Sequence, residues 1–239
     1  MQVKSPTLFI EINHLEFVFV VIDNLENNEH KLLYKNSVPL EGMKNNKISD
    51  FNLVFDILKK NIYLIEKNLN YIFRDVILVL NYFDYSLKNL SGFKKLNGSQ
   101  LVKENITYII NSLKSEINET QKDKTIIHIF NVKYLLDKKE IENLPIGLFG
   151  NFYSHELSFF LIANNDYKNL INIVQNCNLK IKKIISKDFL KGSYIVNKNS
   201  NLESFLKIEI DKKKSHIFFF ENSSLKFIED FKFGSDLIL

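Results

Sequence analysis

The spacing of hydrophobic and polar positions changes several times along the chain, and each change predicts a new element. Residues 7–23 alternate and then run apolar, which predicts two strands joined by a tight turn at Asn13-His14. Residues 30–40 predict a third strand. Apolar side chains then recur at helical spacing behind Ser49, which can cap a helix. Residues 75–80 form a short, almost wholly apolar run, which is typical of a strand buried on both faces.

The next block follows a different pattern. Residues 82–96 read as irregular or weakly extended, and Ser99 opens a second predicted helix. Residues 125–136 and 156–163 then predict strands on either side of a loop. The order in this block is therefore strand, helix, strand, strand.

Beyond this block the first pattern resumes. Asn165 can cap a helix, residues 179–185 predict a strand, and residues 188–196 predict a short helix. A polar linker precedes three further predicted strands, which cover residues 206–210, 216–221 and 225–233. The whole chain thus has an α/β pattern interrupted by one inserted block.

Composition narrows the class of protein. The chain has 239 residues, enough for one or two domains, and its net charge of +4 is spread along the sequence. So mild and dispersed a charge does not indicate a nucleic-acid partner. The single cysteine, Cys177, excludes an internal disulfide. The apolar stretches are too short and broken for a signal peptide or a membrane span, so a cytoplasmic location is expected.

Three segments between residues 126 and 180 match, in their residues and spacing, a pattern known from other proteins. Residues 126–137 read IIHIFNVKYLLD, and residues 143–148 read NLPIGL. The helix that begins at Asn165 ends in residues 176–180, which read NCNLK. Together with the order of elements, and with Glu41-Gly42-Met43 before the first helix, these residues resemble FtsA, a family of actin-like bacterial cell-division proteins. The resemblance covers most of the chain.

The resemblance implies an α/β, actin-like (ribonuclease-H-like) domain with an inserted strand-helix-strand-strand subdomain. It assigns residues 1–81 to the first half of subdomain 1A and residues 82–163 to the inserted subdomain 1C. Residues 164–200 would complete subdomain 1A, and residues 201–239 would begin a second actin-like half that is incomplete.

The resemblance also implies a function. FtsA-like proteins help to assemble the division (Z) ring and anchor it to the membrane, with FtsZ and other division proteins as partners. They self-associate into filaments through the inserted subdomain. The family's FtsZ-binding subdomain and its C-terminal amphipathic membrane helix lie beyond the region matched here, so a truncated sequence is expected. The implied location is the cytoplasmic face of the inner membrane at the division site.

An actin-like nucleotide site presses two hairpin turns against the phosphates, and glycine permits that close approach. The family's first loop reads roughly Asp-Ile-Gly-Thr-Ser-Lys, and its second reads Asp-Ile-Gly-Gly-Gly-Thr-Thr-Asp. Here residues 11–16 read EINHLE and residues 209–216 read EIDKKKSH, without a glycine. The matching candidate positions are Glu11, Asn13, His14, Glu209, Asp211 and Lys212.

Three interpretations of these loops stay open. In the first, they are ordinary turns of a domain that is not an enzyme and needs no cofactor; the loss of every glycine and the presence of Glu16 favour it. In the second, ATP binds weakly, with Glu11 and Glu209 near magnesium and Lys212 or Lys213 near phosphate. In the third, Glu11, His14 and His216 hold zinc or iron, although such loop residues are more often solvated.

The leading hypothesis is therefore a binding and scaffolding protein of bacterial cell division. One alternative within the same fold is a PilM-like protein of type IV pilus assembly, which shares the actin-like core and a similar insertion. The other alternative is an active actin-like ATPase, for which glycine in both phosphate loops would be expected.

Overall fold

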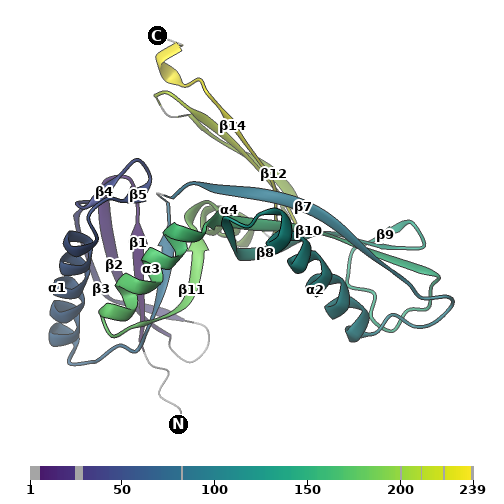
Figure 1. Ribbon diagram of the computed structural model, residues 1–239, viewed down its shortest axis with the longest axis horizontal. Helices are drawn as coiled ribbons and strands as arrows, with labels where there is room; N and C mark the ends of the chain where they lie inside the picture. The colour runs from purple at the N-terminus through teal and green to yellow at the C-terminus, as the bar shows by residue number, and fades with distance from the viewer. Residues whose placement is uncertain are drawn as a thin grey trace. The chain divides into compact units, whose positions relative to one another are not determined.

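The computed structural model describes residues 6–24, 29–81, 83–199, 201–210, 212–222 and 224–237 (Figure 1). The chain divides into two compact units. The first unit comprises residues 1–84 and 162–190, and the second comprises residues 85–161 and 191–239. The inserted block thus lies within the second unit, together with the last strands of the chain.

The first unit is built on a five-stranded sheet with the order β11-β6-β1-β2-β3. Strands β1, β2 and β3 form an antiparallel meander, and β6 runs parallel to both β1 and β11. The strands are β1 (Thr7–Ile12), β2 (Glu16–Asn24), β3 (His30–Pro39), β6 (Asp75–Leu80) and β11 (Lys180–Ser186). A short hairpin of β4 (Met43–Lys44) and β5 (Lys47–Ile48) precedes the first helix.

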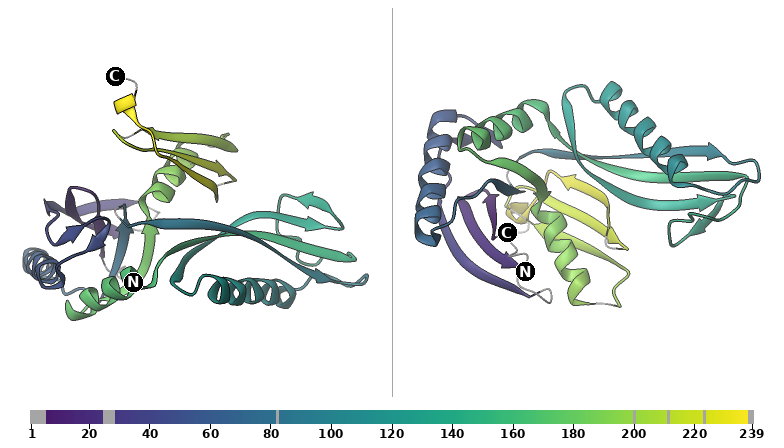
Figure 2. Two further views of the ribbon diagram at one scale, coloured as in Figure 1. Left: turned by 45° about the horizontal axis from the view of Figure 1, so that its top comes forward. Right: turned by 90° about the horizontal axis from the view of Figure 1, so that it is seen from below.

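Helices α1 (Phe51–Leu69) and α3 (Asn164–Asn176) cover one face of this sheet (Figures 1 and 2). The right-handed connections from β3 to β6 and from β6 to β11 run in the same direction along the sheet, so both place their helices on the same side. The side chains on the covered face of the first two strands are at most 2% exposed; they are Leu8, Ile10, Ile12, Phe17, Phe19 and Val21.

The three longer helices begin at other residues than those predicted from the sequence. The Oδ1 atom of Asp50, rather than Ser49, caps α1 by accepting a hydrogen bond from the backbone N–H of Leu53 at 3.0 Å. Helix α3 begins one residue before Asn165, with Ala163 as its N-cap. Helix α2 (Lys103–Thr120) begins four residues after Ser99. Residues 98–101 are instead engaged with the loop at residues 147–150 by backbone hydrogen bonds, which delays the helix.

The inserted block forms a four-stranded sheet with the order β7-β10-β8-β9. Its strands are β7 (Tyr85–Lys95), β8 (Lys124–Leu136), β9 (Lys139–Ile141) and β10 (Phe152–Ala163). Residues 82–96, predicted as irregular or weakly extended, contain β7, a regular strand of eleven residues. Strand β7 lies at the edge of the sheet, where polar side chains are tolerated, and these polar side chains obscure the apolar alternation in the sequence.

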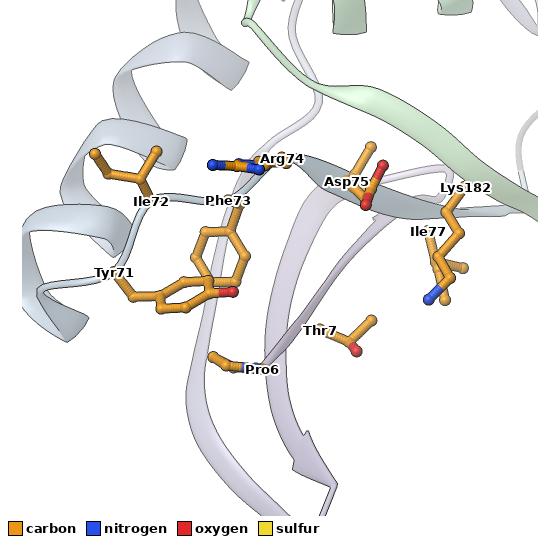
Figure 3. A pocket seen from close by; sticks show the side chains of 10 residues that line it. Pro6, Thr7, Tyr71, Ile72, Phe73, Arg74, Asp75, Ile77 and Lys182 are labelled. Atoms are coloured by element: carbon orange, nitrogen blue, oxygen red, sulfur yellow. The ribbon is translucent and has the colours of Figure 1, made fainter. Parts of the chain in front are cut away.

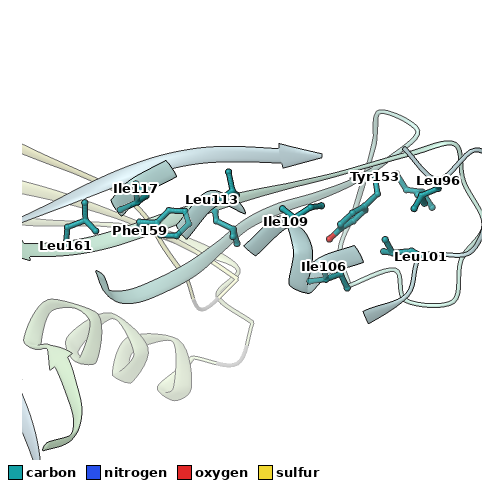
Figure 4. Packing of buried hydrophobic residues seen from close by; sticks show 11 residues of the cluster. Leu96, Leu101, Ile106, Ile109, Leu113, Ile117, Tyr153, Phe159 and Leu161 are labelled. Carbon is teal, nitrogen blue, oxygen red and sulfur yellow. The ribbon is translucent and has the colours of Figure 1, made fainter. Parts of the chain in front are cut away.

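Helix α2 packs on this sheet around one hydrophobic core (Figure 4). Ile106, Ile109, Leu113 and Ile117 recur at helical spacing and are at most 7% exposed. They meet the buried side chains of β10, which include Tyr153 and Phe159. The helix-and-sheet pattern predicted for the block is therefore confirmed, with β9 added to it.

The second unit ends in a three-stranded antiparallel meander. Its strands are β12 (Ser204–Ile210), β13 (Ser215–Glu221) and β14 (Ser224–Phe231), followed by a 3-10 turn at Ser235–Leu237. Lys226 of β14 ties this sheet to β8, because its buried Nζ donates to the carbonyl oxygens of Asn131, at 2.9 Å, and Val132. Burial lowers the pKa of Lys226. Helix α4 (Lys187–Lys198) precedes the meander and spans the boundary between the two units.

Candidate functional site

The turn between β1 and β2 is closed by its own side chain. The Oδ1 atom of Asn13 accepts hydrogen bonds from the backbone N–H groups of Leu15 and Glu16, both at 2.9 Å. A phosphate-binding turn directs such N–H groups at its ligand. Here an anion would first have to displace the Asn13 side chain. The backbone of Asn13 also keeps a negative φ, so it does not reproduce the left-handed conformation available to glycine.

Glu11, the candidate metal-side carboxylate of the first loop, is engaged by a lysine. The Nζ atom of Lys187, the first residue of α4, donates to Glu11 Oε1. The Nδ2 atom of Asn13 lies 3.3 Å from the same oxygen. His14 is exposed at the tip of this turn. The structure therefore brings Glu11 and Asn13 together, but in contacts with the protein itself.

The second predicted loop is the turn between β12 and β13. The strands pair as far as Ile210 and Ser215, and Lys212, Lys213 and Lys214 are exposed between them. Asp211, the remaining candidate in this turn, lies outside the described residues. Beyond the turn, His216 Nδ1 is 2.7 Å from Asp230 Oδ1 on the neighbouring strand. Three side-by-side lysines attract anions, but they do not form a backbone cradle.

Glu209, the carboxylate of the second loop, is also held by lysines. Its Oε1 accepts from Lys191 Nζ at 2.7 Å and from Lys207 Nζ at 2.8 Å. Burial raises the pKa of Glu209, but the hydrogen bonds from the two lysines outweigh burial and leave the pKa lowered. The carboxylate is therefore held in its charged form by ammonium groups of the chain.

Sequence reasoning identified the two carboxylates but missed their lysine partners. Lys187 and Lys191 are four residues apart on α4, one helical turn, and each neutralises one of the two acidic positions within its own unit. Their i, i+4 spacing is visible in the sequence. The spacing alone does not indicate which acidic residue each lysine contacts, because Lys187 lies 176 positions from Glu11 in the sequence.

A hollow of about 420 Å³ lies in the first unit, away from the candidate turn (Figure 3). It is found where β1 and β6 begin, whereas the turn with Asn13 follows the end of β1. Tyr71, Arg74 and Lys182 contribute polar groups to its lining. None of the family's phosphate-loop positions lines it.

In the part of the chain that the structure describes, no group of three or more histidine, cysteine, aspartate or glutamate side chains is arranged to hold a metal ion. No helix in the described ranges is both long and apolar enough to cross a membrane.

The five-stranded sheet with two helices on one face, the inserted sheet and the second meander together define an actin-like fold. A solved chain of the PilM-PilN type IV pilus biogenesis complex superposes with a TM-score of 0.66 at 11% identity. The match covers 98% of this chain and 63% of that chain. The predicted fold class is confirmed. No protein-family model matches the sequence.

Among curated proteins, the chain is similar to the cell division protein FtsA. It is 24% identical to FtsA of Buchnera aphidicola (subsp. Schizaphis graminum) over 178 residues, which cover 74% of this chain and 42% of that protein. It is 21% identical to FtsA of Escherichia coli K12 over 176 residues, covering 74% and 41%. The chain thus spans about two fifths of the length of these relatives, and the resemblance to FtsA is confirmed at the level of sequence.

Proposed function

We propose that this chain is an actin-like scaffolding module of bacterial cell division, which helps to assemble the division ring and anchor it to the membrane through protein-protein contacts. The observation that carries the proposal is the similarity to FtsA over 74% of the chain. The partners in this proposal are FtsZ and other division proteins. The proposed location is the cytoplasmic face of the inner membrane at the division site.

The inserted subdomain is the proposed contact surface. Its loop after β9 exposes four apolar side chains, namely Leu144 (37% exposed), Ile146 (47%), Leu148 (50%) and Phe149 (69%). Backbone hydrogen bonds hold the loop in place, from Gly147 N–H to the carbonyl of Leu101 and from Leu101 N–H to the carbonyl of Leu148. Exposed apolar side chains on an ordered loop are typical of protein interaction sites. In the proposal, this loop joins copies of the chain into filaments.

A fluorescent fusion in dividing E. coli tests the scaffolding function. We expect a band at the division site that colocalises with FtsZ, because the inserted loop would join the fusion to filaments of the FtsA of these cells. The double substitution Ile146→Lys with Leu148→Lys should weaken the band, because it places two charges in the proposed contact. Ile72→Lys is the matched control, since Ile72 is 78% exposed in the other unit. A diffuse signal for the unmodified chain, or recruitment to type IV pilus proteins, would contradict the proposal.

We further propose that the chain is not an enzyme and assembles without ATP. The Asn13 side chain occupies the N–H groups of the first turn, and lysines engage both Glu11 and Glu209. Calorimetric titration with ATP and magnesium should give no saturable binding in the micromolar range. Micromolar binding would refute this part of the proposal and leave the scaffolding role standing.

A further inference from the structure

A single lysine of the last meander is held by three strands of the inserted sheet. Lys226 of β14 is 5% exposed, and its Nζ donates to the carbonyl oxygens of Asn131, at 2.9 Å, and Val132 on β8. Its own carbonyl oxygen lies 3.5 Å from Asn89 Nδ2 on β7 and 3.5 Å from Ser158 Oγ on β10. All of these residues belong to the second unit. Lys226 therefore fastens β14 to the inserted sheet through both its side chain and its backbone.

The charge of Lys226 depends on the position of these two backbone carbonyls. Burial lowers the pKa of the lysine. Three carboxylates act against burial and favour the charged form; they are those of Glu221, 3.9 Å away, Glu140 and Glu156. A buried cation that loses its acceptors is costly, because water does not replace them in a closed site. A shift of β8 at these carbonyls would therefore release Lys226.

Asn131 also makes a second contact, which leads to a histidine. Its Oδ1 lies 3.0 Å from Nε2 of His155 on β10. His155 is 4% exposed, and its Nδ1 is buried with no hydrogen-bond partner in the described part of the chain. Because Oδ1 is an acceptor, the neutral ring keeps its proton on Nε2 and leaves Nδ1 bare. The site therefore fits the neutral imidazole and not the imidazolium.

The surroundings of His155 confirm that a second ring proton would be unfavourable. Tyr134 and Tyr153 lie against the ring, with centroids 4.8 Å and 6.1 Å away, and burial raises the pKa of both, so both stay neutral. Helix α2 contributes apolar side chains to this core. The neighbouring Glu156 pairs with Lys133 at 3.5 Å. An imidazolium would place an unsatisfied N–H in this buried site, so the ring would have to move toward water and disturb its contact with β8.

We propose that Asn131 joins His155 and Lys226 into an acid-sensitive latch between the inserted sheet and the last meander. At neutral pH the latch is closed, and the two sheets stay together. When His155 takes up a proton, its movement displaces Asn131, the carbonyls that hold Lys226 shift with β8, and β14 is freed. The latch lies within the second unit and depends neither on FtsZ nor on the filament contact proposed for the inserted loop.

The latch can be measured from the histidine, because coupling between two sites is reciprocal. If protonation of His155 releases Lys226, then removal of Lys226 makes protonation easier. In the closed latch, burial lowers the pKa of His155 to about 4. We expect Lys226→Met to raise this pKa, with a gain in proton affinity of roughly tenfold, in an NMR titration of the ring protons. Lys139→Met removes an exposed lysine of the same subdomain and is the control, with an unchanged pKa.

A charge effect of Lys226 through space would also raise the pKa of His155, and Asn131→Ala distinguishes the two causes. This substitution removes the side chain that contacts His155 but keeps the carbonyl that accepts from Lys226. In the Asn131→Ala background, adding Lys226→Met should leave the pKa of His155 unchanged, because the link between the two residues is already broken. A charge effect through space would persist in this background.

Exchange of the Lys226 ammonium protons with water measures the release itself, and it does not need a Lys226 variant to fold. At pH 5 we expect exchange to be at least about fivefold faster in the unmodified chain than in His155→Gln, which does not titrate. At pH 7 the two chains should exchange alike. The proposal would be overturned by a His155 pKa that Lys226→Met does not move, by coupling that survives Asn131→Ala, or by equal ammonium exchange at pH 5.

Discussion

The Oδ1 atom of Asn13 lies 2.9 Å from the backbone nitrogen of Glu16, and this hydrogen bond closes the turn between β1 and β2. Its neighbour, the N–H of Leu15, donates to the same oxygen. Asn13 stands where the FtsA-like pattern has glycine. Its side chain accepts the hydrogen bonds of the backbone N–H groups that a phosphate would otherwise accept. The turn is stabilised by the chain itself.

Replacing Asn13 by Ala should loosen this turn. A hydrogen bond contributes about 1 kcal/mol, and water replaces part of what is lost at this partly exposed site. We expect the amides of Leu15 and Glu16 to exchange with solvent roughly fivefold faster, as measured by hydrogen exchange. Asn13→Asp keeps the acceptor oxygen, so its amides should exchange more slowly than those of Asn13→Ala even though its second oxygen faces Glu11. Unchanged exchange in Asn13→Ala would show that the side chain does not hold the turn.

Local sequence patterns were sufficient for much of the fold. The strand at residues 75–80 was predicted with its observed bounds, because an uninterrupted apolar run is typical of a buried parallel strand. The edge strand β7 was predicted only as an irregular or weakly extended segment, since its exposed positions are polar. The helix starts at Ser49, Ser99 and Asn165 were wrong by one to four residues, because contacts elsewhere in the fold decide which residue caps.

The candidate site was predictable only in part. Matching to the family predicts Glu11 and Glu209 as the acidic residues of the two phosphate loops, and in the structure they lie near the ends of β1 and β12. What happens to their charge depends on Lys187 and Lys191, which the fold of each unit brings to them. A propensity or a motif does not contain that information, because the partners meet through tertiary packing.

The lowered pKa of Glu209 makes a pH-dependent contribution to stability. Between the ordinary value near 4.5 and the lowered folded value, the unfolded chain binds a proton that the folded chain does not. Stability should therefore fall as the pH drops through this window. Lys191→Met removes one of the two lysine donors, so the pKa of Glu209 should rise in a carboxyl NMR titration. Lys187→Met is the control, because its partner is Glu11. An unmoved Glu209 titration in Lys191→Met would contradict the pairing.

His155 should destabilise the inserted subdomain in mild acid. It is 4% exposed, its Nε2 is 3.0 Å from Asn131 Oδ1, and burial lowers its pKa from 6.5 to about 4. Between these two values the unfolded chain is protonated at this position and the folded chain is not. The linkage predicts a loss of roughly 2 kcal/mol between pH 7 and pH 5. Urea unfolding at both pH values measures it.

The control for this prediction is a pair of histidine substitutions. His155→Gln retains a polar group beside Asn131 but does not titrate, so its stability should change less between pH 7 and pH 5 than that of the unmodified chain. His30→Gln changes an exposed histidine and should keep the full pH dependence. Equal pH dependence in the unmodified chain and His155→Gln would refute the role of His155.

Gly192 tests how closely α4 packs on the last sheet. In a free helix, Gly→Ala stabilises by about 1 kcal/mol. At position 192 an added Cβ would overlap the ring of Phe220, and overpacking of a core costs about 1–3 kcal/mol. We expect the cost of this overlap to exceed the gain in helix propensity, so Gly192→Ala should lower the free energy of unfolding. Asn197→Ala is the control at an exposed position of α4 and should be neutral or slightly stabilising. Phe220→Leu makes room for the methyl group of Gly192→Ala, so a double-mutant cycle of the two substitutions should give a favourable coupling energy. Additive effects would mean that the two residues are not in contact.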